Sequence, residues 1–382
     1  MNTARKLLAL LPLLLTTFAV RTQSPIILGY VLGHDHLIQP GEIDAHKLTR
    51  IHYAFLYPEA GKVSAAWPTD DANLRTLVAL KRTSPNLEVL ASIGGGAHSS
   101  GFSDLALTAR SRQVFVASCM ALIQQYTLDG IDIDWEYPGS STPSHPSRAE
   151  DRENYTLLLH DLREAFDHDK LAPHKHLILS TATNGKPFFL HATDMRAASR
   201  YLDTIALMGY DDYGPNSTTT GNHAPLFTNL ADPTAYSDSR YIRDYLTDGV
   251  PAAKIVLGVP FYGYGWHNVP PANHGLFQPV SKGSAFDVTF NELTAHELAS
   301  DSGFVRYWDQ ASAVPYLYNA ATHTFITYED AKSLASKAAF VRQSGLAGIM
   351  FWEYSGDSNN ILLNEIDNDL GLNPTSAKPT AP

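Results

Sequence analysis

Cysteine is nearly absent from this chain, because its 382 residues include a single one, Cys119. No internal disulfide is therefore possible. The segment "VFVASCMALIQQY" repeats Phe115, Cys119, Leu122 and Tyr126 at helical spacing. This pattern favours a small buried side chain in a helix over a reactive nucleophile.

Basic residues are also scarce, with 28 Lys and Arg against 39 Asp and Glu and a formal net charge of −11. No run of Lys or Arg is long enough to follow a phosphate backbone. We therefore expect no nucleic acid as a partner.

Long apolar runs are missing except at the N-terminus, "MNTARKLLALLPLLLTTFAV", where Arg5 and Lys6 precede leucines and small or polar residues follow. This is typical of a secretory signal peptide, here residues 1–23, and it is too short for a stable membrane span. A buried core helix is the alternative, but Pro12 would interrupt it. We expect a secreted or periplasmic protein with a disordered Pro/Thr/Ala-rich tail over 371–382.

Short β-rich runs recur along the chain, separated by segments that read as helices or loops. Eight such runs predict an α/β fold, a TIM (β/α)8 barrel, although two domains would also fit the length. The runs cover residues 26–31, 51–56, 87–95, 130–136, 176–182, 204–210, 254–261 and 346–352.

One interval, residues 262–327, breaks this rhythm with aromatics, prolines and short β-like pieces. A structureless loop of that size would be unusual, so we expect a small α+β insertion between the seventh strand and its helix. The barrel then occupies 24–261 and 328–370. "TYED", Thr327 to Asp330, reads as a capping box for the helix-prone "AKSLASKAAFVRQ", and Gly345 as its stop.

The segment "LDGIDIDWEYPG", residues 128–139, places acids among residues that otherwise predict a buried strand. Successive side chains in a strand point to opposite faces, so Asp132, Asp134 and Glu136 share one face, about 6–7 Å apart. The isoleucines and the tryptophan between them take the face that packs on helices. The acids therefore point into the barrel, and Glu136 lies at the C-terminal rim, where barrel enzymes carry their chemistry.

Three carboxyl groups this close cannot all be ionised cheaply, so protons must be shared and some pKa values raised. A carboxyl that stays protonated near neutral pH suits general-acid catalysis. A divalent metal or a structural carboxylate network are the alternatives. The histidines at 34, 36, 174 and 176 form no ligand motif such as HExxH, so we expect no metal and no cofactor.

These residues carry a family resemblance. "DGIDIDWE" resembles the DxxDxDxE motif of glycoside hydrolase family 18, the chitinases and their relatives. "SIGGG" (Ser92 to Gly96) is similar to the family's SxGG motif and "MGYDDYG" (Met208 to Gly214) to its MxYD motif. "GIMFWEYSGD" resembles its eighth strand with a tryptophan, and the similarity covers roughly residues 25–370.

The resemblance implies retaining, substrate-assisted catalysis, in which the sugar's own acetamido carbonyl attacks its anomeric carbon. It implies that Glu136 protonates the glycosidic oxygen and later activates water. Asp134 would orient the acetamido group and Asp132 would share a proton with Asp134. Ser92 would support Asp132, and Asp129 would have a structural role near the strand start.

The resemblance also implies a sugar pocket. Tyr210 would donate its hydroxyl toward the acetamido oxygen, Asp211 would contact the distorted sugar, and Trp352 would be the floor on which the sugar stacks. The remaining substrate-binding residues that we expect are Met208, Tyr30, Phe55 and Gly95.

Three positions depart from the family pattern. Gly96 and Ala97 follow SxGG where many chitinases have a tryptophan, Tyr264 stands where an arginine is common, and Asp212 where an aromatic is usual. None belongs to the inferred acid machinery. They argue against binding of long, crystalline chitin chains, and they leave soluble oligomers or another N-acetylglucosamine glycan open as substrates.

The leading hypothesis is a secreted, monomeric chitinase that cleaves β-1,4 linkages between N-acetylglucosamine units. A non-catalytic chito-oligosaccharide-binding protein is an alternative, although inactive relatives commonly replace the position of Glu136 and this chain keeps it. Endo-cleavage of N-glycan cores or of peptidoglycan also remains open.

Overall fold

The computed structural model describes residues 24–34, 36–140, 146–169, 175–232, 234 and 236–371. The predicted signal peptide lies outside these residues, as does the predicted tail apart from Gly371. None of the helices in this part of the chain combines the length and the apolarity needed to cross a bilayer.

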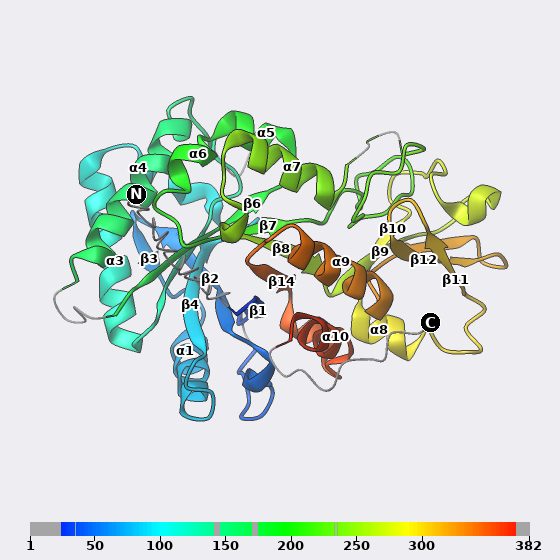
Figure 1. Cartoon of the computed structure of the whole chain (residues 1–382), viewed down its shortest axis with the longest axis horizontal. Coiled ribbons are helices and arrows are strands. Elements are labelled where there is room, and N and C mark those ends of the chain that lie inside the picture. The colour runs from blue at the N-terminus through cyan, green and yellow to red at the C-terminus, as the bar shows by residue number, and fades with distance from the viewer. Residues whose placement is uncertain are drawn as a thin grey trace, which may run out of the picture.

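Eight parallel strands form a closed barrel (Figure 1). They follow the order β1-β14-β8-β7-β6-β5-β4-β2, and pairing of β1 with β2 closes the ring. Each predicted β-rich run overlaps one of these strands, so the barrel prediction is confirmed. The strands are β1 (Ile26–Leu32), β2 (Arg50–Glu59), β4 (Glu88–Gly94), β5 (Gly130–Asp134), β6 (Ile178–Asn184), β7 (Thr204–Met208), β8 (Ile255–Pro260) and β14 (Gly348–Trp352).

Helices cover the outside of the barrel (Figure 1). They are α1 (Asp70–Ala79), α2 (Phe102–Ala106), α3 (Ala109–Tyr126), α4 (Asp151–Asp167), α5 (Pro187–Ala192), α6 (Met195–Ala198), α7 (Asp238–Asp248), α9 (Ala331–Gln343) and α10 (Ile361–Leu370). The outward face of β5 packs on them, since Trp135 just after the strand stacks on Phe102 of α2 at 5.4 Å between ring centroids. Cys119 of α3 is fully buried, and burial raises its thiol pKa, so it is an inert core residue as expected.

A second, antiparallel sheet lies between β8 and α9 in the chain, on the right of Figure 1. Its strand order is β10-β9-β13-β12-β11. This part of the chain comprises β9 (Tyr262–Trp266), β10 (Ala285–Thr289), α8 (Phe290–Ala295), β11 (Val305–Asp309), β12 (Val314–Asn319) and β13 (Thr324–Thr327). The short strand β3 (Lys62–Ser64) belongs to neither the ring nor this sheet and pairs with β2. The exact boundaries of an inserted domain stay a prediction.

The predicted start of α9 was wrong. Thr327 is the last residue of β13, and its hydroxyl accepts the backbone N–H of His223 rather than capping a helix. The cap is Asp330, whose side chain accepts the N–H of Ser333 at 3.0 Å while the Ser333 hydroxyl accepts the N–H of Asp330 at 2.9 Å. Gly345 follows the helix with φ +64°, so the predicted stop is confirmed.

The inward face of the barrel is polar along much of its length. Near the N-terminal ends of the strands, Arg50 of β2 donates to Glu88 of β4 and to Thr204 of β7. One layer higher, Asp132 of β5 is in register with Ser92 of β4. The next inward residue on β5 therefore reaches the carboxyl end of the barrel, where the site lies.

A buried ion network joins α7, α9 and the end of the second sheet. Lys337 of α9 has its Nζ 2.9 Å from Asp238 Oδ2 and 2.7 Å from Glu329 Oε1, and it donates to the Ala224 carbonyl. All three charged side chains are 1 % exposed or less. Losing one partner of such a network leaves charges buried without compensation.

Replacing Lys337 by Met should therefore lower the free energy of unfolding by about 3–5 kcal/mol, measured by urea denaturation. The matched control is Arg75→Met, which breaks a pair with Asp71 whose side chains are both 58 % exposed, and which should leave unfolding unchanged. Equal effects of the two substitutions would contradict the assignment.

Candidate active site

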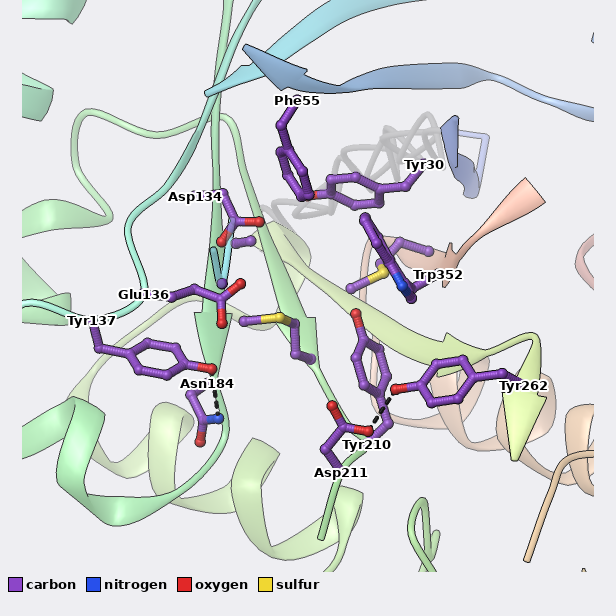
Figure 2. A pocket seen from close by; sticks show the side chains of 14 residues that line it. Tyr30, Phe55, Asp134, Glu136, Tyr137, Asn184, Tyr210, Asp211, Tyr262 and Trp352 are labelled. Carbon is purple, nitrogen blue, oxygen red and sulfur yellow. Dashed lines mark hydrogen bonds between the residues drawn. The ribbon is translucent and has the colours of Figure 1, made fainter. Parts of the chain in front are cut away.

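A cavity opens at the carboxyl ends of the barrel strands and encloses about 240 Å³ (Figure 2). Residues from seven of the eight barrel strands, or from the loops that follow them, line it. They are Tyr30, Phe55, Gly96, Asp134, Glu136, Tyr137, Ala182, Asn184, Met208, Tyr210, Asp211, Tyr262, Met350 and Trp352. Eight of the predicted site residues are in this set.

Asp134 and Glu136 form the acidic wall of the cavity. Asp134 ends β5 and Glu136 follows two residues later, so the alternation of the strand directs both carboxyl groups inward, where they face each other (Figure 2). Burial and the neighbouring charges of Glu136 and Asp132 raise the pKa of Asp134 well above its ordinary value, and a hydrogen bond links it to Glu136. Burial, together with the charge of Asp211, also raises the pKa of Glu136. The raised pKa values favour one proton on this pair of carboxyl groups.

Asp132 lies behind this pair and is completely buried. Its Oδ2 accepts hydrogen bonds from the Tyr30 hydroxyl at 2.9 Å and the Ser92 hydroxyl at 2.7 Å. Burial acts to raise its pKa, but the nearby His52 and these two donors hold the pKa below its usual value. The environments of neighbouring carboxyl groups thus separate their pKa values, as acid–base assignments require. The directions of these shifts favour the charge on Asp132 and the proton on the pair above it.

Four of the predicted residues do not line the cavity: Asp132 and Ser92, which lie behind the acidic pair, and Gly95 and Asp129. Gly95 does not line it; Gly96 does. Gly95 instead has φ +83°, and a Cβ there would come within 2.6 Å of the Phe55 ring, so glycine makes room for that ring. Asp129 sits just before β5, where it pairs with Lys81 at 2.5 Å and with Lys175 at 2.9 Å, so it fixes strand ends rather than substrate.

The wall opposite the acids is aromatic. Trp352, the last residue of β14, stacks on Phe55 with 5.3 Å between ring centroids and 19° between ring planes. The Tyr210 hydroxyl points into the cavity (Figure 2), and burial raises its pKa, so it stays a neutral hydrogen-bond donor. Tyr262 donates to Asp211 Oδ1 at 2.5 Å. Such a lining suits a sugar ring, which offers an apolar face and a polar edge.

A second hollow of about 370 Å³ adjoins the cavity on the side of the antiparallel sheet. The two hollows share Asp211, Tyr262 and Trp352, while β10 and the start of α8 supply residues such as Asp287 and Glu292 to the second. The cleft is therefore longer than one sugar ring needs.

Three polar residues that line the cavity were not predicted from the sequence: Tyr137, Asn184 and Tyr262. Asn184 ends β6 and donates to the Tyr137 hydroxyl at 3.3 Å (Figure 2). Tyr262 begins β9, two residues after β8 ends. Their position at the carboxyl ends of barrel strands was the available signal. Across the described residues, no group of three or more His, Cys, Asp or Glu side chains is arranged to hold a metal ion.

Comparison with known proteins identifies the family. Residues 26–357 match the model of "Glycosyl hydrolases family 18". The chain belongs to this family. Chitinase A1 of Niallia circulans is 38 % identical over 312 residues, which is 78 % of this chain and 44 % of that protein.

Two solved structures are close in fold. Chitinase ChiW from Paenibacillus sp. str. FPU-7 has a TM-score of 0.86 and 38 % identity over 91 % of this chain and 43 % of that one. A family 18 N-acetylglucosaminidase from Paenibacillus barengoltzii has a TM-score of 0.83 and 36 % identity over 90 % of this chain and 99 % of that one. The chain thus spans less than half the length of chitinase A1 and of ChiW, and nearly all of the N-acetylglucosaminidase.

Asp212, which stands where the family pattern has an aromatic, follows Asp211 in the chain, and its side chain is only 1 % exposed. The Tyr241 hydroxyl donates to it and Lys186 Nζ is 3.7 Å from its Oδ1. Burial outweighs these contacts and raises the pKa of Asp212 to about 7. The folded protein therefore keeps a proton here that the unfolded chain releases near pH 4.

From this difference we predict how Asp212→Asn changes stability with pH. Between about pH 4 and pH 7 the unfolded parent binds fewer protons than the folded parent at this site, so rising pH destabilises the parent. Asn cannot ionise, so the variant should gain stability relative to the parent across this window, by at most about 1.4 kcal/mol per pH unit. Urea denaturation at several pH values measures it. A stability difference that stays constant from pH 4 to pH 8 would contradict the raised pKa.

Proposed function

We propose that the protein is a secreted chitinase-type glycoside hydrolase that cleaves β-1,4 linkages between N-acetylglucosamine units with retention of configuration. The observation that carries the proposal is the pair of facing carboxyl groups of Asp134 and Glu136, which lie above the buried Asp132 in a cavity with an aromatic wall. Secretion rests on the N-terminal sequence pattern alone.

In the proposed first step, Glu136 donates the proton to the glycosidic oxygen as the bond breaks. General-acid catalysis of this kind contributes about 10²–10⁴ in rate. The acetamido carbonyl oxygen of the same sugar attacks the anomeric carbon and forms an oxazolinium ion. Because this nucleophile is already part of the substrate, its positioning entropy is paid in advance.

Asp134 and Tyr210 hold the acetamido group in this reaction. Asp134 accepts the acetamido N–H, which stabilises the positive charge that develops on the amide. The Tyr210 hydroxyl donates to the carbonyl oxygen, and the sugar ring stacks on Trp352. In the second step Glu136, now a carboxylate, takes a proton from water. The water attacks the anomeric carbon on the face that the leaving sugar vacated, opposite the amide oxygen, so the acetamido group is restored and the configuration is retained.

Chito-oligosaccharides are the proposed substrates. The second hollow beside the cavity supports the binding of more than one sugar unit. Gly96 on the cavity wall offers no stacking surface where many chitinases have a tryptophan, which favours soluble oligomers over crystalline chitin. The names of the two relatives, a chitinase and an N-acetylglucosaminidase, agree with an N-acetylglucosamine glycan. Cleavage of N-glycan cores or peptidoglycan instead is an outcome that the experiment distinguishes.

Glu136→Gln tests the assignment of the acid. The amide cannot donate the proton, so kcat on a fluorogenic N-acetylated chito-oligosaccharide should fall by about 10²–10⁴. Calorimetric titration with the N-acetylglucosamine hexamer should still detect binding.

The matched control is Glu153→Gln, an exposed residue of α4, which should retain parental turnover. A Glu136→Gln variant within tenfold of the parent would refute the role. A parent that binds the hexamer without cleaving it would instead support a binding protein.

A further inference from the structure

His52 is a fully buried histidine inside the barrel, one layer below the cavity. It comes from β2, where it is in register with Tyr30 of β1, and the two rings meet edge to face at 5.0 Å. Its Nδ1 lies 3.4 Å from Oδ2 of Asp132, which is within ion-pair distance. Neither ring nitrogen has a hydrogen-bond partner among the described residues. The family resemblance assigned no role to this position.

Asp132 needs a positive charge nearby. Tyr30 and Ser92 donate to the same Oδ2 that His52 faces, while Oδ1 has no partner in the described part of the chain. These hydroxyls are neutral, and burying an unpaired carboxylate is costly. Within the residues described, His52 is the basic side chain that lies within ion-pair distance of Asp132, and it would pair with Asp132 when protonated.

The other charged groups near Asp132 and His52 already have partners of their own. Arg50, two residues before His52 on β2, donates from Nε and Nη2 to Glu88 at 2.9 and 2.7 Å. The titratable and charged groups around the pair are Tyr30, Arg50, Glu88, Asp134, Tyr155 and Tyr210. The tyrosines are neutral, and Asp134 shares its proton with Glu136. His52 therefore faces one uncompensated anion.

We propose that His52 is a positioning residue: as an imidazolium it is the buried counter-cation of Asp132, and it keeps the shared proton on Asp134 and Glu136. The inference rests on the proposed glycosidase function for its consequence, though not for the ion pair itself. Without this positive charge, Asp132 would compete for the proton, and fewer molecules would hold it where the glycosidic oxygen binds.

A second buried histidine provides the contrast. His223 is equally inaccessible, but burial and the nearby Lys337 lower its pKa to about 3. Its closest carboxylate contact is 4.0 Å, from Nδ1 to Oδ1 of Asp211, which Tyr262 already satisfies. His223 is therefore neutral and serves as an internal reference for His52.

His52→Asn tests the proposal through the pH profile. Asn keeps a side-chain N–H donor toward Asp132 but carries no charge, so each neighbouring carboxyl group becomes easier to protonate. The acidic limb of the kcat profile should move upward by about one pH unit, with kcat below that limb reduced roughly tenfold, since an opposite charge within 4–6 Å shifts a carboxyl by one to three units. KM should change by less than about threefold, because His52 does not line the cavity.

The matched control is His176→Asn. His176 is 63 % exposed and pairs with Asp203, so its loss should leave both limbs in place. A His52→Asn profile that superimposes on the parent would overturn the proposal, because a neutral histidine would be replaced by a neutral amide with no effect on charge.

A measurement on the parent protein decides the ion pair without activity. Nitrogen-15 NMR of the imidazole rings at pH 6 should show His52 with both nitrogens protonated and His223 as a neutral tautomer. A neutral His52 would overturn the inference, even if His52→Asn failed to fold. A parent without turnover on any N-acetylated glycan would instead refute the proposed function and leave the NMR result standing.

Discussion

Mutual repulsion among Asp132, Asp134 and Glu136 inside the barrel constrains the residues around them. One strand places all three on one face, so the surrounding structure must decide which of them is charged. Asp132, the deepest of the three, accepts hydrogen bonds from Tyr30 and Ser92 and lies near His52. Asp134 and Glu136, which line the cavity, have raised pKa values that favour a proton on this pair. The acid–base chemistry follows from this division.

The aromatic wall shows a related use of burial. Position 264 is a tyrosine where an arginine is common in the family, so Asp211 has no arginine partner there. Tyr262 and Tyr264 donate hydrogen bonds to Asp211 instead. The side chain of Asp211 is 50 % exposed, and its partial desolvation outweighs the two hydroxyls and raises its pKa. This wall also borders the second hollow, so the antiparallel sheet helps to shape the site.

The sequence allowed the barrel to be predicted because a strand's alternation and its turn residues are local properties. The same alternation predicted the inward acids, and the family motifs predicted Tyr210, Asp211 and Trp352. What failed depended on tertiary contacts. Whether Gly95 or Gly96 faces the cavity depends on where the Phe55 ring lies, and the cap of α9 moved to Asp330 because His223 donates to Thr327. In the sequence, His52 has no feature that distinguishes it from other strand residues, because its proximity to Asp132 is a tertiary contact.

Time-resolved proton NMR of the products is the most direct test of the account, since it reports the anomer formed before mutarotation. The account predicts that the β anomer appears first from N-acetylglucosamine oligomers. It also predicts no cleavage of the bond that follows a sugar without its acetyl group. An α anomer formed first, or equal cleavage after a glucosamine unit, would contradict a mechanism in which the substrate supplies its own nucleophile.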